Sequence, residues 1–263
     1  MKGMKNVETV QFQVKERVAT IQLNRPEVLN AMDEQLLKEF LATLKEVRRS
    51  EADIVVISGS GRGFSAGGDI KSMLSSLNQD QFEEIMETIS ELVYTLYSLP
   101  KITISAVHGP AAGLGFSIAL ACDYLVAHAQ SKLVMNFIGI GLIPDGGGHY
   151  FLDKRLGEVK AKQLIWSGKP LNGEEAYELG LVDELITDED FQTAVEKKAA
   201  DLLKQPIKAI IETKKIYTDL NCSQLKQILA LEKESQFYMR QTADHQEGVK
   251  AFMDKREPQF NGK

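Results

Sequence analysis

The residues best suited to chemistry lie in a glycine-rich stretch between Lys101 and Asp123. A short apolar run of strand length ends just before Gly109, and the apolar run 116–121 that follows the loop is typical of a helix. The first turn of a helix presents amide donors without partners and a partial positive charge, and glycines let a ligand come close to the backbone. Such a loop can hold an anion or a developing oxyanion. A tight strand-to-helix turn that binds nothing is the alternative interpretation.

A second glycine-dense loop, from Gly59 to Ile70, follows the buried-strand pattern of residues 54–57. Its glycines fit neither the G-x-G-x-x-G spacing of dinucleotide-binding loops nor the phosphate-loop pattern that ends in Gly-Lys-Ser/Thr. Both nucleotide-binding interpretations are therefore disfavoured. A third sharp turn at residues 144–148, Pro-Asp-Gly-Gly-Gly, leads into a helix expected at about residues 149–156.

Metal and nucleophile chemistry have weaker support. Cys122 lies in an apolar helix and Cys222 in a polar stretch, without the CxxC spacing of metal or redox sites. The four histidines lack H-x-x-x-H spacing, which argues against a metal site. Ser117 lacks the G-x-S-x-G setting of a serine nucleophile, and we expect its hydroxyl to bond a helix carbonyl. We therefore expect no bound metal.

The composition is that of an ordinary globular protein. The 263 residues suit one large domain or a core with an appendage, and 43% of them are hydrophobic and 26% charged. The formal net charge of -6 excludes a broadly basic surface for nucleic acid. No apolar run has spanning length and Met1 to Gly3 open no signal peptide, so we expect a cytoplasmic protein without a membrane partner.

Strands and helices alternate along most of the chain. Residues 7–23 predict a β-hairpin, and apolar residues recur at helical spacing after Asp33 and again from Phe82 to Leu96. Pro100 ends the second of these helices before the apolar strand that precedes Gly109. This succession predicts an α/β fold with right-handed crossovers and a core between layers.

The C-terminal region is predicted to be almost wholly helical. Helices are expected near Glu189–Lys204, Gln205–Leu220, Ser223–Gln241 and His245–Asp254. Apolar residues of these helices, such as Leu231 and Phe252, cannot be buried within the region alone and need the core or a neighbouring subunit as partner. We therefore expect an oligomer, built from a core domain at residues 1–200 and a helical region for oligomerisation and pocket closure at residues 201–263.

Together with further motifs, the glycine loops resemble those of the crotonase superfamily, the enoyl-CoA hydratase/isomerase family. The similarity covers nearly the whole chain, and the motifs occur in the family's order, which is far more specific than any single glycine motif. The matching segments are Leu23–Pro26 with Asn30–Ala31, Phe64–Ile70, His108–Gly115, Ala121–Asp123, Gly141–Gly147, Gly168 with Ala176–Val182, and Glu247–Phe252.

This resemblance implies a fold, a ligand and an assembly. The implied fold is the α/β crotonase (ClpP/crotonase-type) spiral of repeated ββα units, followed by a helical C-terminal region. That region builds homotrimers, which often pair into hexamers as dimers of trimers. The implied ligand is an acyl-CoA thioester, so coenzyme A is expected as part of the substrate and no separate cofactor is expected.

The resemblance also assigns residues. The oxyanion-hole amides are expected to be those of Ala66 and Leu114, which would stabilise the enolate-like oxygen of a deprotonated or attacked thioester. The backbone near Asp69 and Ile70 is expected to hold the adenine end, and Lys255 to meet phosphates. The full set expected to bind substrate is Arg25, Ala66, Gly67, Asp69, Ile70, Gly113, Leu114, Ser117, Phe137 and Lys255.

The acid and base groups depart from those of the family's hydratases. The resemblance implies two glutamates that activate water, and their positions hold Ser117 and Phe137 in this chain. Neither side chain can act as a carboxylate base. Asp145 matches the acid/base carboxylate of the family's isomerases, and one carboxylate suffices to move a proton from the α to the γ carbon of a 3-enoyl thioester. The resemblance therefore favours 3-enoyl to 2-enoyl isomerisation.

Three alternatives stay open at this point. In the first, Asp145 only caps a helix, since Pro-Asp-Gly is a common turn sequence. In the second, the chain is an enoyl-CoA hydratase or another crotonase-type enzyme with a different base. In the third, it is a non-catalytic acyl-CoA-binding subunit. An apolar wall would raise the pKa of Asp145 and a helix N-terminus would lower it, and the sequence leaves that balance open.

Overall fold

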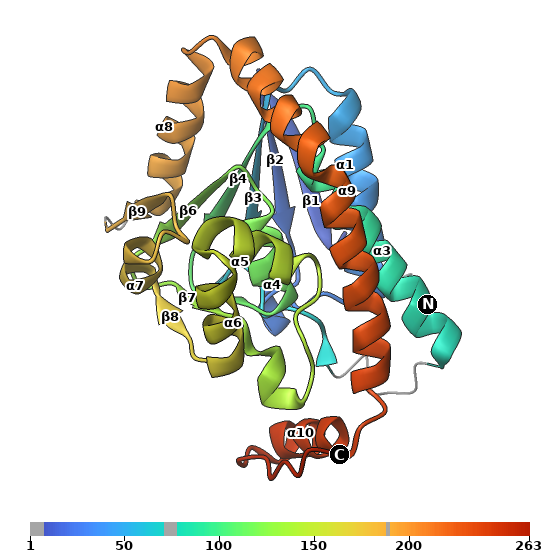
Figure 1. Ribbon diagram of the computed structural model, residues 1–263. Coiled ribbons are helices and arrows are strands. Elements are labelled where there is room, and N and C mark those ends of the chain that lie inside the picture. The colour runs from blue at the N-terminus through green and yellow to red at the C-terminus, as the bar shows by residue number, and fades with distance from the viewer. Residues whose placement is uncertain (1–7, 71–77, 188–189) are drawn as a thin grey trace, which may run out of the picture.

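The computed structural model describes residues 8–70, 78–187 and 190–263 (Figure 1). Val7 and Glu189, which begin a predicted strand and a predicted helix, lie outside the described residues, as does the segment at Met1 to Gly3. Within the described part of the chain, strands and helices alternate as far as residue 186, and only helices and loops follow.

A six-stranded sheet forms the centre of the fold, with strand order β1-β2-β3-β4-β6-β9. The first two strands are the predicted antiparallel hairpin, and all later neighbours are parallel. Every residue of β3 and β4 is buried, as expected of parallel strands covered on both faces. The strands are β1 (Val10–Lys15), β2 (Val18–Leu23), β3 (Ile54–Gly59), β4 (Ile102–Val107), β6 (Tyr124–His128) and β9 (Glu184–Ile186).

Three short strands form a second sheet beside the first, in the order β5-β7-β8. They are β5 (Pro110–Ala112), β7 (Lys132–Val134) and β8 (Leu171–Asn172). Of these, β5 lies inside the glycine-rich stretch where only a loop is predicted from sequence. It pairs in parallel with β7, and this pairing places the glycines that follow it at the start of a helix.

Helices cover both faces of the central sheet, and two apolar cores result. On one face, Val55 and Ile57 pack with the long helices α1 and α3; on the other, Ile54 and Val56 pack with α8. Figure 1 shows α1 and α3 side by side, and α9 crossing the molecule toward α10. The α-helices are α1 (Glu34–Arg49), α3 (Gln79–Tyr97), α4 (Leu114–Leu120), α5 (Gly148–Leu156), α6 (Glu158–Ser167), α7 (Gly173–Glu178), α8 (Phe191–Leu203), α9 (Ile207–Met239) and α10 (Ala243–Asp254), and the 3-10 helices are η1 (Pro26–Val28) and η2 (Asn136–Ile140).

The C-terminal helices differ from the prediction in one respect. The two helices expected over 205–220 and 223–241 form the single 33-residue helix α9. Its sequence contains no glycine or proline, so the polar residues near Asn221 have nothing to break the hydrogen-bond ladder. One continuous helix therefore connects the sheet, near Ile207, with the far end of the molecule. The helix α6 is not predicted from the sequence at all.

The two glycine loops that follow β3 and β4 pair with each other along their length. The amide of Phe64 donates to the His108 carbonyl at 2.9 Å, and the amide of Ser65 donates to the Pro110 carbonyl at 3.0 Å. The Ala112 amide returns a hydrogen bond to the Ser65 carbonyl at 2.9 Å. This pairing brings segments far apart in the sequence into one rigid unit at the ends of adjacent parallel strands.

The side chain of Asn30 holds the first of these loops in place through hydrogen bonds. This side chain is fully buried, and its Nδ2 donates to the carbonyls of Ser60 at 2.9 Å and of Gly63 at 2.8 Å. Its Oδ1 accepts from the amide of Arg25 at 2.9 Å. The residue has a φ of 55°, a left-handed conformation that asparagine tolerates better than most residues. The Asn30 side chain thus satisfies backbone groups of the loop that regular secondary structure leaves without partners.

Asn30→Ala is expected to lower the free energy of unfolding by about 2 to 4 kcal/mol, because it leaves buried carbonyl groups without donors. Urea denaturation measures this. The matched control is Asn24→Ala, whose side chain donates one exposed hydrogen bond, to the Glu8 carbonyl, and whose loss should cost less than about 1 kcal/mol. Equal effects of the two substitutions would contradict this role for Asn30.

Candidate active site

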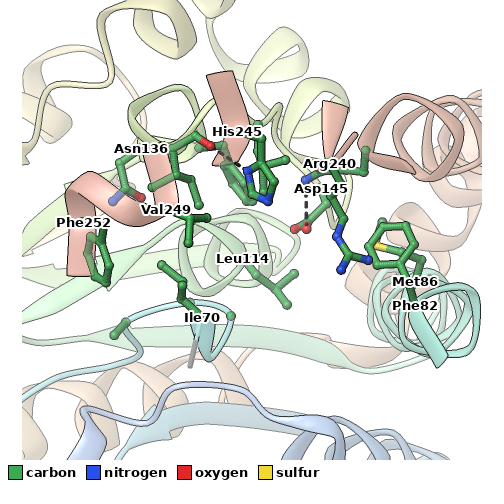
Figure 2. A pocket seen from close by; sticks show the side chains of 18 residues that line it. Ile70, Phe82, Met86, Leu114, Asn136, Asp145, Arg240, His245, Val249 and Phe252 are labelled. Carbon is green, nitrogen blue, oxygen red and sulfur yellow. Dashed lines mark hydrogen bonds between the residues drawn. The ribbon is translucent and has the colours of Figure 1, made fainter. Parts of the chain in front are cut away.

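A pocket opens where the paired glycine loops meet α3, α9 and α10. Its walls come from the loop residues Ala66 to Gly68 and Ile70, from the start of α4, and from η2 and the turn that follows it. Figure 2 shows Phe252 of α10 at one end of this space and Phe82 and Met86 of α3 at the other, with Leu114 of α4 between them. Most lining side chains are apolar, and the polar ones are Asn136, Asp145, Gln236, Arg240 and His245.

Asp145 is the one lining carboxylate among the described residues. Its side chain is 7% exposed, and its Oδ2 accepts a hydrogen bond of 3.3 Å from Nε2 of Gln236. The other oxygen, Oδ1, is buried and has no hydrogen-bond partner in the described structure. Gln236 is held in place because its Nε2 also donates to the Ile143 carbonyl at 2.7 Å. One carboxylate oxygen is therefore fixed and the other is unengaged.

Glu232 lies on α9, one helical turn before Gln236. Its carboxylate reaches the start of α5. Its carboxylate accepts hydrogen bonds from the amides of Gly147 at 2.7 Å and of His149 at 3.2 Å, and it contacts Nδ1 of His149 at 2.8 Å. Its side chain is only 3% exposed. These are amides of the first turn of α5, which a carboxylate satisfies well. The N-terminus of α5 is thus capped by a residue from a distant helix.

Burial and the nearby Glu232 cap together determine the electrostatics of Asp145. Burial disfavours the charged carboxylate, and the nearby negative charge of Glu232 disfavours it further. The hydrogen bond from Gln236 acts in the opposite direction. Together these effects raise the pKa of Asp145 to about 8. Glu232 already occupies the N-terminus of α5, so the partial positive charge of that helix end does not lower the pKa of Asp145. The effect of burial therefore dominates.

Two amides of the glycine loops are available to a ligand. The Leu114 amide starts α4, where no earlier helical carbonyl can accept it, and among the described residues neither it nor the Gly68 amide has an acceptor. The expectation for Ala66 needs correction, because its amide donates to the Leu29 carbonyl at 2.8 Å. The Gly67 amide donates to Oγ of Ser65 at 3.1 Å. Between Phe64 and Asp69, Gly68 is therefore the residue whose amide has no acceptor in the described parts of the chain.

Gly67 allows the two loops to come this close. Its φ is 91°, and a Cβ atom there would lie 2.6 Å from the Ala112 carbonyl oxygen and 3.4 Å from the Leu114 amide nitrogen. Real Cβ atoms do not approach a backbone oxygen so closely. A residue with a side chain would push the loops apart near Gly68 and Leu114, which have free amides and line the pocket.

Several other predicted binding residues do line the pocket. They are Ile70, Gly113 and Phe137, together with Ala66, Gly67 and Leu114. The apolar ring of Phe137 lies close to Gly113. A Cβ atom added to Gly113 would lie 3.5 Å from this ring. Phe137 therefore offers no carboxylate that could activate water, and the polar group beside it is the Asn136 amide, whose Oδ1 would lie 3.7 Å from the same Cβ position.

Four predicted binding residues lie elsewhere. Nη1 of Arg25 donates to the Ala31 carbonyl at 2.6 Å and pairs with Asp69 at 3.1 Å, so these two side chains brace the loop instead of lining the pocket. Ser117 is fully buried, and its Oγ donates to the Gly113 carbonyl at 3.4 Å, the helix-carbonyl bond expected for its hydroxyl. Lys255 is exposed and ends α10 in a left-handed conformation.

The sequence predicts that the C-terminal helical region closes the pocket, but it does not identify which residues of that region line it. Gln236 and Arg240 line the pocket from the end of α9, and His245, Val249 and Phe252 line it from α10. The usable signal was the spacing of Glu232, Gln236 and Arg240, which recur every four residues and so share one helix face. That spacing becomes informative only when the helix is known to be continuous and to pack on the core.

Two negative findings apply to the residues that the structure describes. No group of three or more histidine, cysteine, aspartate or glutamate side chains is arranged to hold a metal ion within residues 8–70, 78–187 and 190–263. In the same part of the chain, no helix has the length and apolar character needed to cross a bilayer.

Comparison with known proteins identifies the family. Residues 13–263 match the family model described as enoyl-CoA hydratase/isomerase. YhaR of Bacillus subtilis, named only as a member of the enoyl-CoA hydratase/isomerase class, is 49% identical over 97% of this chain and 99% of its own. The 1,2-epoxyphenylacetyl-CoA isomerase of Escherichia coli is 34% identical over 98% of this chain and 100% of its own. The chain therefore belongs to the enoyl-CoA hydratase/isomerase family.

Solved structures agree with this assignment. An enoyl-CoA hydratase from Mycobacterium avium subsp. paratuberculosis matches with a TM-score of 0.88 and 31% identity, covering 97% of this chain and 99% of the other. An enoyl-CoA hydratase from Bacillus halodurans matches with a TM-score of 0.87 and 26% identity, covering 92% and 99%. The crotonase fold and the family predicted from the sequence are thus confirmed.

Asp145→Asn is expected to stabilise the protein increasingly as pH rises. The native pKa of about 8 lies above the value near 4 of an unfolded aspartate, so the native state binds the extra proton between these values. Wild-type stability should then fall as pH rises from about 4 to 8, and the asparagine variant lacks this loss. Urea denaturation at pH 5 and pH 9 should show its relative stability growing by about 2 kcal/mol or more.

The control is Asp219→Asn, which alters an exposed carboxylate on α9. The difference in unfolding free energy between this variant and wild type should be the same at both pH values, because an exposed group stays solvated in the folded and unfolded states. If the Asp145 variant shows the same flat behaviour, its carboxyl group is not buried as described.

Proposed function

We propose that this enzyme isomerises 3-enoyl-CoA thioesters to 2-enoyl-CoA thioesters, with Asp145 as the acid/base group. The observation that carries the proposal is the buried carboxylate itself. It is the single lining carboxylate of the described pocket, one of its oxygens is unengaged, and its pKa of about 8 suits proton transfer near neutral pH. No separate cofactor is proposed, since coenzyme A belongs to the substrate.

The proposed reaction begins with the thioester oxygen at the amides of Gly68 and Leu114. Ionised Asp145 removes a proton from the α carbon, and the electron pair delocalises into a dienolate whose oxygen carries the charge. The two amides stabilise that charge, and one such donor contributes about 3 to 4 kcal/mol in comparable sites. Asp145 then returns the proton to the γ carbon, so the double bond moves from C3–C4 to C2–C3. Substrate and product have the same atoms.

Two features favour this reaction over hydration. Hydration needs a group that holds and activates water, and the positions that the resemblance assigns to that task hold Ser117 and Phe137. Ser117 is a fully buried residue of α4, and Phe137 is apolar. The names of similar proteins include both hydratases and isomerases, and the isomerase from Escherichia coli supports the choice by its name alone. Hydration is the second candidate function, and it is measured alongside isomerisation.

Asp145→Asn is expected to reduce isomerisation of 3-hexenoyl-CoA by a factor on the order of 1000, because an amide cannot accept the proton. Ultraviolet absorbance of the conjugated 2-enoyl thioester measures this. Affinity for hexanoyl-CoA, which cannot react, should change little and serves as the control for the pocket. Water addition to crotonyl-CoA by wild type that survives the substitution would favour the hydratase alternative.

The same assay across pH gives a second readout. Because ionised Asp145 is the base, kcat/KM should rise with pH through about 8 and then level off. A profile that is flat from pH 6 to pH 9.5 would exclude Asp145 as the group that removes the proton. Thioester binding without turnover of either substrate would favour the non-catalytic alternative.

We also propose that the chain assembles as a homotrimer or as a hexamer. The support is an exposed apolar face on α9, where Ile216, Tyr217 and Leu220 are 61%, 64% and 72% exposed. Such side chains on one helix face are typical of an interface.

Light scattering after gel filtration should give about three or six times the mass of one 29.3 kDa chain. Leu220→Lys should shift the protein toward smaller species, because it places a charge in the buried contact. Asp219→Lys adds charge at the neighbouring exposed position and should leave assembly intact. A wild-type mass equal to one chain would refute the assembly.

A further inference from the structure

Arg240 is an unusual lining residue for a pocket of this composition. It follows the last residue of α9, and its guanidinium carbon lies 4.2 Å from the centre of the Phe82 ring. Its side chain is partly buried, and burial lowers its pKa. No acidic side chain in the described parts of the chain forms an ion pair with it, whereas Lys233 on the same helix pairs with Glu87 at 3.3 Å. Arg240 thus carries a desolvated charge without a counter-charge.

The other titratable groups of the pocket do not balance this charge at neutral pH. Asp145, with a pKa of about 8, is mostly protonated there. His245 is kept neutral because burial and the nearby Arg240 lower its pKa. Its Nδ1 lies 2.8 Å from the Ile140 carbonyl, which can only accept, so Nδ1 carries the hydrogen and Nε2 does not. Arg240 is therefore the one charged side chain at neutral pH among the described lining residues, and the Glu232 carboxylate next to Asp145 is already engaged by the start of α5 and by His149.

The position of Arg240 indicates which part of a thioester would meet this charge. In Figure 2, Arg240 lies with Phe82 and Met86 at one end of the pocket, and Ile70 and Phe252 lie at the other, with Leu114 and Asp145 between them. If the thioester carbonyl binds at Leu114 and the coenzyme leaves past Ile70, the acyl chain extends toward Arg240. The contact with the Phe82 ring uses none of the guanidinium N–H donors, and no acceptor in the described parts of the chain takes them, so they can bind a planar anion.

We propose that the preferred substrates are acyl-CoA thioesters whose acyl chain ends in a carboxylate, with Arg240 as its partner. A carboxylate matches the guanidinium in charge and shape, and it supplies the counter-charge that the described pocket lacks. A purely hydrocarbon tail would instead leave the charge desolvated and unpaired, which is unfavourable. This inference rests on the proposed function for the orientation of the thioester, but its first test does not require turnover.

Equilibrium binding of unreactive thioesters provides that test. Wild type should bind adipoyl-CoA or suberyl-CoA at least about tenfold more tightly than hexanoyl-CoA or octanoyl-CoA of the same length, as expected for a charge-assisted pair. Arg240→Met should abolish this preference, and Arg240→Lys should retain part of it. Lys233→Met removes one positive charge from the same helix outside the pocket, and it should keep the full preference. Comparing ratios within each variant cancels general losses of affinity.

The kinetic test compares 3-hexenedioyl-CoA, esterified at one end, with 3-hexenoyl-CoA. Wild type should give the higher kcat/KM with the carboxylated thioester, and Arg240→Met should remove the difference. Equal binding of the carboxylated and plain thioesters by wild type would overturn the inference, and so would a preference that persists in Arg240→Met. A binding preference without isomerisation of either unsaturated thioester would support the role of Arg240 and refute the proposed reaction.

Discussion

The hydrogen bonds between the two glycine loops are the constraint on which the rest of the site depends. Adjacent parallel strands end at the same edge of the sheet, so β3 and β4 deliver their loops side by side. The short bridge between Ser65 and Ala111 then fixes their relative position. Once these backbone groups are used, the amides of Gly68 and Leu114 are left without acceptors. The proposed site for a thioester oxygen thus follows from which backbone groups the fold has already satisfied.

Burial is the main cause of the raised pKa of Asp145, and a helix that is remote in sequence adds to it. Glu232 satisfies the first amides of α5 and contributes negative charge beside Asp145 at the same time. A structural cap and an electrostatic influence therefore come from one carboxylate. Gln236, one turn later, holds a single oxygen of Asp145 and leaves the other unengaged. The raised pKa of Asp145 therefore comes from its surroundings, since the turn that carries this residue is an ordinary one.

The fold could be predicted from the sequence because its signals are local or lie in contiguous motifs. Apolar periodicity located α1 and α3, and Asp33 and Pro100 marked a helix start and a helix end. The pocket could be predicted only where its residues belong to those motifs. Ala66 shows the limit, since its amide is engaged by Leu29, a contact between distant segments that no pattern in the sequence records. The roles of Gln236 and Arg240 likewise depend on how α9 packs.

The continuity of α9 has a consequence for how such enzymes can diversify. Residues 232, 236 and 240 face the pocket region from three successive turns of one helix, and each contacts a different part of it. The loops that present free amides belong to other elements entirely. Substitutions at these positions of one helix can therefore alter the surroundings of Asp145 and the far end of the cavity separately, without changing the glycine loops that are proposed to bind the thioester. The architecture thus places the proposed chemical step and the choice of substrate on different elements.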